Sequence, residues 1–219
     1  ISYMIRYPAR TAPCPLGTHL GALAARLCLA ALSAAMRGML GQAASTCSYA
    51  DWLDADLIVL FGSNVPNNQP VTTKYLHHAR QRGAQIAVVN PYREPGLQRY
   101  WIPSIASSAW SGTPLADHWF DVHTGGDLAF LIGVLRCLAE RDGLDRAFID
   151  AHTTGVDEAV AAARATEWPD IEAQCGMSRA TIGTFADLLV ARPKAVFVWS
   201  MGLTQHAHGV DTVKALVNV

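Results

Sequence analysis

The chain has 219 residues, enough for one large domain with a sizeable core, and 51% of them are hydrophobic. Charged residues make up 16%, below the roughly 25% usual for soluble domains, so we expect part of the surface to be covered by other parts of a larger protein. The net charge of -1 at pH 7 and the lack of a Lys/Arg cluster exclude an electrostatic surface for nucleic acid.

The five cysteines are odd in number and form no CxxC pair, so they predict neither a disulfide framework nor a zinc or iron–sulfur site. A reducing, cytoplasmic compartment is therefore expected. The apolar stretch from Leu20 to Leu40 is interrupted by Arg26 and Arg37 and is too short in its charge-free part for a membrane span.

The chain begins with a proline-rich segment over residues 1–19, which predicts irregular structure. A helix is expected over residues 22–39, ended near Gly41. Because the chain opens on Ile1 and closes on an unfinished helical pattern, we expect both ends to lie inside a longer polypeptide.

A strand, a helix and a second strand follow with short connections. Continuous apolar runs predict buried strands over 56–62 and 84–91, and a helix over 70–82 stops at Gly83. The polar residues 63–69 predict a loop. This order predicts a right-handed βαβ unit with a parallel sheet.

The second half of the chain is mainly helical. An excursion over 92–123 lacks clean periodicity, and we expect Trp101, Trp110 and Trp119 to pack it internally. A third buried strand is predicted over 194–200, before a loop over 202–209 and a last helix. Further helices are expected over 127–141, 146–152, 155–164 and 178–191, with Asp127 and Ser178 near N-caps. The fold class predicted is α/β: a doubly wound, mostly parallel sheet with helices on both faces, a Rossmann-like cofactor-binding domain.

Three polar loops follow the three predicted strands, over residues 62–70, 90–96 and 201–206, and Gly125-Gly126-Asp127 opens a helix. Ligands of open parallel sheets bind at the carboxyl ends of strands, so these loops predict a shared nucleotide-like ligand. The alternative is that Asn-rich loops are only turns and caps, because Asn favours the left-handed conformation. The missing GxGxxG and GxxxxGK[ST] motifs argue against an ordinary NAD or ATP site.

These loops, in this order, resemble the dimethyl sulfoxide reductase superfamily of molybdopterin oxidoreductases, in its formate-dehydrogenase-like alpha-subunit branch. The resemblance runs from about Ala25 to Val219. It is carried by Ala25-Arg26-Leu27-Cys28 and by residues 44–52, 56–103, 145–149 and 199–206.

The resemblance implies a large enzyme that holds molybdenum between two molybdopterin guanine dinucleotides, with a [4Fe-4S] cluster whose ligands lie outside this segment. It implies two-electron oxidation of formate or a similar small substrate, with the rest of the polypeptide and an electron-transfer protein as partners. Residues 1–50 would lead to the metal region, and residues 51–219 would form a C-terminally truncated dinucleotide-binding domain. The isolated segment is expected to be inactive.

The resemblance also assigns site residues. Cys28 would ligate molybdenum and be catalytic, and a soft thiolate suits a sulfur-coordinated metal. His206 could lie near the ligand. The residues that would contact one dinucleotide are Gly62, Asn64, Asn67, Asn68, Asn90, Arg93, Gly125, Asp127, Met201, Gly202 and Gln205.

The sequence departs from the family pattern at two of these places. Leu29 stands where the family usually has His, and Asn90 stands where relatives often have Asp. A catalytically degenerate cofactor-binding or interaction domain is therefore an alternative. A third reading is an unrelated nucleotide-binding α/β domain.

Overall fold

The computed structural model describes residues 30–42, 45–103 and 105–219. Residues 30–40 are helical, and Ala35 and Met36 are buried in the main core. This confirms the later part of the helix predicted over 22–39. Residues 22–29, and the irregular segment predicted over 1–19, lie outside the described residues. The division of the chain near residue 50 stays a prediction.

Four strands of the described residues form a parallel sheet in the order β3-β2-β1-β4. In this sheet β1 (Leu57–Phe61) pairs with β2 (Gln85–Val89) on one side and with β4 (Ala195–Trp199) on the other. β3 (His118–Phe120) extends the sheet beyond β2. The chain winds from β1 outward to β3 and then returns to β4, so the direction of winding switches between β1 and β4.

The predicted βαβ unit is confirmed, with α4 (Thr72–Gln81) between β1 and β2. The loop predicted over 63–69 contains one helical turn, α3 (Val65–Asn68). Pro66 stands at the start of this turn, where its fixed φ suits a helix.

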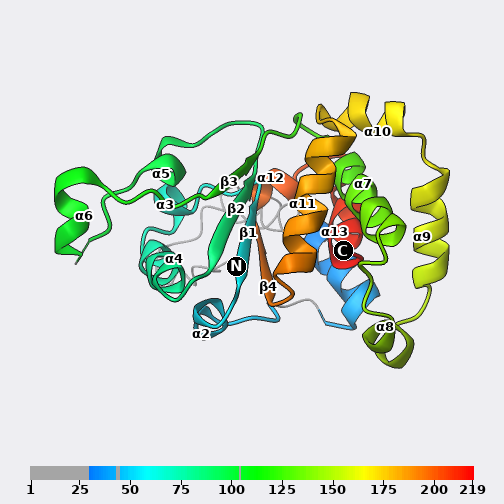
Figure 1. Ribbon diagram of the computed structural model, residues 1–219, viewed down its shortest axis with the longest axis horizontal. Coiled ribbons are helices and arrows are strands. Elements are labelled where there is room, and N and C mark those ends of the chain that lie inside the picture. Colours follow the sequence, from blue (N-terminus) through cyan, green and yellow to red (C-terminus); the bar gives the residue numbers. More distant parts are fainter. Residues whose placement is uncertain (1–29, 43–44, 104) are drawn as a thin grey trace, which may run out of the picture.

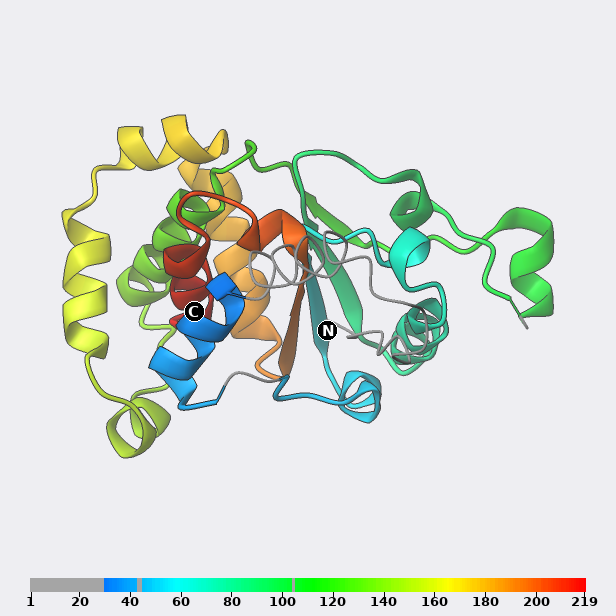
Figure 2. The same cartoon turned by 180° about the vertical axis from the view of Figure 1, so that it is seen from behind.

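Helices cover both faces of the sheet (Figures 1 and 2). Alternate side chains of a strand point to opposite faces. Leu57, Val59 and Phe61 therefore share one core with α7 (Asp127–Glu140), α11 (Arg179–Ala191) and α13 (Gly209–Val217). Ile58 and Leu60 share the other core with α4 and with α2 (Tyr49–Leu53). The predicted doubly wound α/β fold is confirmed.

Four phenylalanines tie the strand ends to the helices of the first face. Phe61 and Phe120 close β1 and β3, and their rings lie 6.2 Å and 4.9 Å from that of Phe185 on α11. Phe130 on α7 lies 5.0 Å from Phe185. Aromatic pairs at such distances add to the stability that burial alone provides. This cluster holds the start of α7 close to the carboxyl ends of the strands.

The four predicted helices of the second half are confirmed as α7, α8 (Arg146–His152), α9 (Val156–Ala165) and α11. Ser178 caps α11, because its Oγ accepts a hydrogen bond from the backbone N–H of Thr181. A further helix, α10 (Trp168–Cys175), was not predicted. Its signals are a proline near its start and the left-handed Gly176 after its end.

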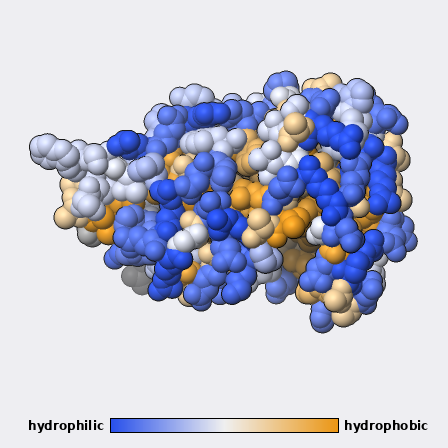
Figure 3. Space-filling model, viewed as in Figure 1, coloured by the Kyte–Doolittle hydropathy of each residue, from blue (hydrophilic) through white to orange (hydrophobic). Residues whose placement is uncertain are grey.

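The prediction that β4 is a buried strand is wrong in part. Four of its five residues are only half-buried, because β4 forms an edge of the described sheet. Figure 3 shows apolar residues gathered in the middle of this face, over β4 and α11, between the hydrophilic surfaces of α4 and α9. In the described part of the chain, every helix is too short or too polar to cross a bilayer.

The excursion over 92–123 contains α5 (Pro95–Gln98), α6 (Ala106–Ser111) and β3. The strand was missed because three residues are too few for a periodic pattern. An antiparallel bridge between Tyr100 and Thr113 closes an arm that carries α6 away from the sheet (Figure 1). Trp101 and Trp110 are 63% and 98% exposed, so the expectation that they pack the excursion is wrong.

Candidate functional site

The loops after β1 and β4 meet backbone to backbone at the point where the winding of the sheet switches. A Cβ atom on Gly62 would lie 2.8 Å from the carbonyl carbon of Gly202, and one on Gly202 would lie 2.7 Å from the carbonyl oxygen of Gly62. Gly62 also has a φ of +53°, which a residue with a Cβ adopts only at a cost. Only glycine at both positions allows this approach.

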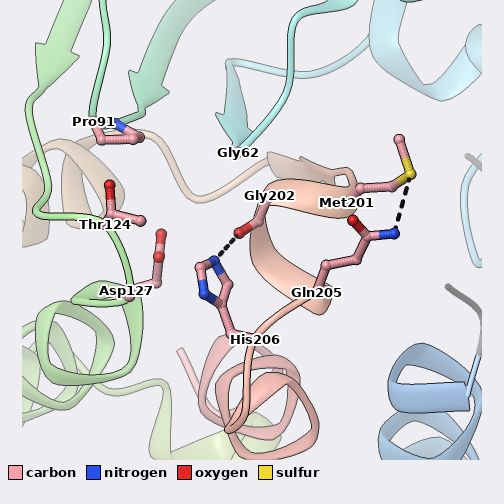
Figure 4. Close-up of a pocket in the computed structure, with 9 residues that line it drawn as sticks. Gly62, Pro91, Thr124, Asp127, Met201, Gly202, Gln205 and His206 are labelled. Atoms are coloured by element: carbon pink, nitrogen blue, oxygen red, sulfur yellow. Dashed lines mark hydrogen bonds between the residues drawn. The ribbon is translucent and has the colours of Figure 1, made fainter. Parts of the chain in front are cut away.

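A pocket of about 310 Å³ opens beside the glycine contact (Figure 4). It lies at the switch point, where open α/β sheets bind their ligands. Four segments contribute to it: the residue after β1, the second residue after β2, the turn into α7, and α12 (Met201–Thr204) with its following loop. Its walls are Gly62, Pro91, Thr124, Gly125, Asp127, Met201, Gly202, Gln205 and His206.

Asp127 is the buried acid of this pocket. It is the first residue of α7 and is only 7% exposed. Burial raises the pKa of its carboxyl group from the ordinary 3.8 to about 6, while its own backbone N–H and the charge of His206 oppose that rise. A carboxyl group that is buried at some cost, and that faces a pocket, is a candidate for ligand contact.

The turn that presents Asp127 leaves no room for a side chain at its middle. A Cβ atom on Gly126 would lie 2.6 Å from the carbonyl oxygen of Gln174 and 2.8 Å from the Cα of Cys175. The N–H of Gly126 donates to the His123 carbonyl at 2.8 Å. Gly126 occupies the N-cap position of α7 and Asp127 follows it, which confirms the prediction that Asp127 lies near the N-cap. The start of α7 is therefore fixed against the end of α10.

His206 stands on the opposite wall of the pocket. Its Nε2 lies 2.6 Å from the carbonyl oxygen of Gly202, which can only accept, so Nε2 carries the proton of this hydrogen bond. In Figure 4 the imidazole lies between this carbonyl and the side chain of Asp127. Gln205, one residue earlier, points its Nε2 at the Met201 sulfur at 3.6 Å.

The structure brings six of the predicted contact residues to the pocket: Gly62, Gly125, Asp127, Met201, Gly202 and Gln205. The other five are not among the residues that line it. The Asn64 side-chain carbonyl oxygen is buried and has no hydrogen-bond partner among the described residues. Asn67 and Asn68 are exposed on α3. Cys28, the predicted metal ligand, and its neighbour Leu29 lie outside the described residues.

Asn90 and Arg93 follow β2 and are held by β3 and by the residue after it. Asn90 is 6% exposed and its backbone N–H donates to the carbonyl of Phe120. The Arg93 guanidinium forms a two-point ion pair with Asp121, through Nε at 3.0 Å and Nη2 at 2.7 Å. It also lies 5.7 Å from the ring centre of Trp119.

The residue-by-residue prediction missed Pro91 and Thr124 as pocket walls and left His206 open. Pro91 is the last residue of the second predicted strand, and Thr124 directly precedes the Gly125-Gly126 pair, so chain position alone could have indicated both. Across residues 30–42, 45–103 and 105–219, no three His, Cys, Asp or Glu side chains gather in a group that could hold a metal ion.

The family model described as "Molybdopterin oxidoreductase" matches residues 19–219. The chain belongs to the molybdopterin oxidoreductase family. This confirms the family that the loops resemble, and it implies a molybdenum–pterin cofactor.

Two relatives and a solved structure place this molybdopterin oxidoreductase segment among longer proteins. Protein YdeP of Escherichia coli (strain K12) is 34% identical over 205 residues, which are 88% of this chain and 27% of YdeP. A nitrate reductase of Klebsiella oxytoca is 27% identical over 196 residues, which are 89% of this chain and 20% of that protein. Acetylene hydratase from Pelobacter acetylenicus shares the fold, with a TM-score of 0.72 at 19% identity, over 88% of this chain and 24% of that one. The chain thus spans about a quarter of YdeP and less of the nitrate reductase.

Proposed function

We propose that this chain holds one molybdopterin guanine dinucleotide in a molybdenum-dependent oxidoreductase, with the dinucleotide lying along the carboxyl edge of the sheet. The observation that carries the proposal is the pocket at the switch point, where two glycine backbones meet beside a buried carboxyl group. Sheets of this class bind dinucleotides at this place.

The residues present fit the chemistry of such a ligand. Gly62 and Gly202 both line the pocket, so the main chain at the ends of β1 and β4 borders the space that a pyrophosphate would occupy. The Asn64 carbonyl oxygen is a buried acceptor without a partner in the described part of the chain, so a ribose hydroxyl or a ring N–H would satisfy it.

Asp127 favours a ring edge over a phosphate at the start of α7. A helix N-terminus ordinarily favours phosphate, but here a carboxylate already occupies the first position of the helix. A second anion would be repelled, whereas a ring edge that carries N–H donors would be bound. Guanine and pterin share such an edge, a 2-amino-4-oxopyrimidine, and adenine lacks it.

The remaining predicted contacts extend from this pocket. We propose that Asn67 and Asn68 face the same dinucleotide, that Asn90 and Arg93 lie near its guanosine end, and that Gly125, Met201 and Gln205 complete the wall. A phosphate near Arg93 would have to share the guanidinium with Asp121.

For the whole protein we propose two-electron oxidation of formate or a similar small substrate in the cytoplasm, with electrons passed through a [4Fe-4S] cluster to a partner protein. The bound molybdenum would supply the two-electron redox chemistry, and Cys28 is the proposed protein ligand to the metal. The similarity to a nitrate reductase favours nitrate reduction as a second candidate activity. Leu29, which cannot transfer a proton, favours a catalytically degenerate domain as the third reading.

The test is cofactor analysis of the full-length protein purified from a host that makes the molybdenum cofactor. We expect about one molybdenum and two guanine nucleotides per chain after acid release, and dye-linked oxidation of formate. Absence of molybdenum and pterin would overturn the proposal.

Two substitutions separate the activities. Cys28→Ser should abolish turnover while guanine nucleotide content stays, because Cys28 acts at the metal and not on the dinucleotide. Activity that appears only after Leu29→His would identify a degenerate site, and reduction of nitrate without oxidation of formate would identify the second candidate.

A further inference from the structure

We propose that His206 is a positioning residue, which keeps the Asp127 carboxyl group in its ionised, ligand-accepting form and fixes the Gly202 backbone beside it. The inference rests on the proposed function, because it concerns how the same pocket accepts the 2-amino-4-oxopyrimidine edge shared by guanine and pterins. Its basis is the arrangement of His206, Gly202 and Asp127 around one pocket.

The first step concerns the proton on His206. The Gly202 carbonyl accepts a hydrogen bond from Nε2 at 2.6 Å, and this bond does not involve Nδ1. The ring thus holds the Gly202 loop in either protonation state, and it becomes a cation when Nδ1 is protonated. Gly202 is the residue whose backbone touches Gly62, so the same hydrogen bond supports the glycine contact.

The second step concerns Asp127. Within the described part of the chain, its carboxyl group accepts a hydrogen bond only from its own backbone N–H, and burial raises its pKa. A protonated carboxyl group would present an O–H to a ligand edge that also carries donors, and binding would fail. The positive charge of His206 acts against this protonation.

Among the described residues, Asp127 and His206 are the ionisable side chains that line the pocket. Other ionisable groups lie on the elements next to the pocket. The His123 ring, in the turn before α7, lies where a side chain on Gly176 would clash with it. On α10, burial raises the pKa of the Cys175 thiol, which keeps it neutral. On α13, Asp211 and Lys214 are half-exposed and lie 3.8 Å apart.

The substitution His206→Gln isolates the charge from the hydrogen bond. A glutamine amide N–H can still donate to the Gly202 carbonyl, but it carries no charge at any pH. His206→Ala removes both. The matched control is His208→Gln, the same change two residues later, at an exposed side chain that does not line the pocket.

The experiment measures binding of guanosine diphosphate and of free pterin to the full chain by calorimetry between pH 5 and 8.5, with adenosine diphosphate as the negative ligand. In the unaltered protein, affinity should rise with pH through about 6, where the Asp127 carboxyl group ionises. In His206→Gln the rise should move to higher pH, which lowers affinity at pH 6 by about threefold to tenfold, with little change at pH 8.5. His208→Gln should follow the unaltered protein.

Two further variants, Asp127→Asn and its combination with His206→Gln, complete the experiment. Asp127→Asn should bind weakly at every pH, and adding His206→Gln to it should change nothing more, because the charge of His206 acts through Asp127. Carbon-13 NMR of the Asp127 carboxyl group reports its titration directly, without a ligand, and should show the same upward movement in His206→Gln.

The outcomes separate the inference from the proposed function. A titration of Asp127 that is unchanged in His206→Gln overturns the inference, as does equal binding of adenosine diphosphate or no binding of guanosine diphosphate and pterin. None of these results decides whether the full-length protein carries molybdenum and guanine nucleotide, which the cofactor analysis decides alone. Binding of pterin without guanosine diphosphate would assign the pocket to the pterin end.

Discussion

The carboxyl edge of the sheet has two halves that differ in how they are built. The switch-point half, Gly62, Asp127, Gly202 and His206, joins three segments through backbone contact, a buried carboxyl group and one short hydrogen bond. The asparagine half, Asn67, Asn68 and Arg93, consists of exposed side chains, one of which is already paired with Asp121. Both halves contain predicted ligand contacts, and the first half lines the pocket at the switch point.

The difference shows that the type of a residue and its position in the folded structure are separate kinds of evidence for a binding site. Asparagine amides suit phosphates and sugars, yet on α3 they are free to serve as an exposed helix turn. The presence of a glycine or of a single aspartate says little about a ligand. In the switch-point half, however, the backbone at these residues is held in place by neighbouring main chain. The predictions below test whether this contrast holds in stability and in binding.

The largest expected effect is that of Gly62→Ala. The new Cβ would meet the Gly202 backbone at 2.8 Å, and the residue would keep a φ of +53°. We expect the free energy of unfolding to fall by about 2–4 kcal/mol, measured by urea denaturation. Gly125→Ala is the matched control, since its φ is +82° but a Cβ there meets nothing within 4 Å. Gly125→Ala should lower the free energy of unfolding by only about 1 kcal/mol. An equal loss in the two variants would show that the contact between Gly62 and Gly202 is not responsible.

The next effect is that of Asp127→Asn on stability against pH. The folded carboxyl group has a pKa of about 6 against an ordinary 3.8, so the folded state holds its proton more tightly than the unfolded state does. The unaltered protein therefore loses stability as pH rises from about 4 to 6, by about 3 kcal/mol at most. The variant lacks this loss.

It follows that Asp127→Asn should be more stable than the unaltered protein at pH 8 and no more stable near pH 4. Thermal unfolding of both proteins across this range measures the difference. A variant that is less stable at pH 8 would show that the ionised carboxyl group stabilises the fold, which contradicts a role kept for ligand binding.

A smaller effect is expected for Asn64→Ala, at the border of the two halves. Its buried carbonyl oxygen lacks a partner among the described residues, so removing it should leave stability unchanged or raise it by up to about 1 kcal/mol. Affinity for guanosine diphosphate should fall if this oxygen accepts from the ligand. Unchanged affinity would remove Asn64 from the site.

The smallest effect is expected for Asn67→Ala and Asn68→Ala. Both side chains are exposed, and such changes usually alter stability by less than about 0.5 kcal/mol. We expect affinity for guanosine diphosphate to fall less in either variant than in Asp127→Asn. A loss as large as that of Asp127→Asn would reverse the contrast between the halves.

Much of the fold was predictable because its long elements have strong local patterns. The apolar runs that became β1, β2 and β4, and the glycine after α4, are signals that neighbouring residues carry by themselves. β3 and α10 were missed because three residues show no period and because α10 starts with a short Trp-Pro sequence. The half-burial of β4 depends on strand order, which no local pattern gives.

The sequence could predict which residues belong to the site, but not the contacts that hold them together. The resemblance supplied Gly62, Asp127 and Gly202 by position. That Gly62 touches Gly202, 140 residues away, follows only once β4 is known to lie beside β1. The burial of Asp127 and the hydrogen bond of His206 likewise require the tertiary arrangement.

The contact of Gly62 with Gly202 also limits how this protein can change in evolution. At most packed positions, a larger residue can be accommodated by a smaller one opposite. Here each glycine is opposed by the main chain of the other, which no substitution can shrink. The two positions therefore have no compensating partners, and a related sequence that lacks either glycine must also have displaced one of the two loops.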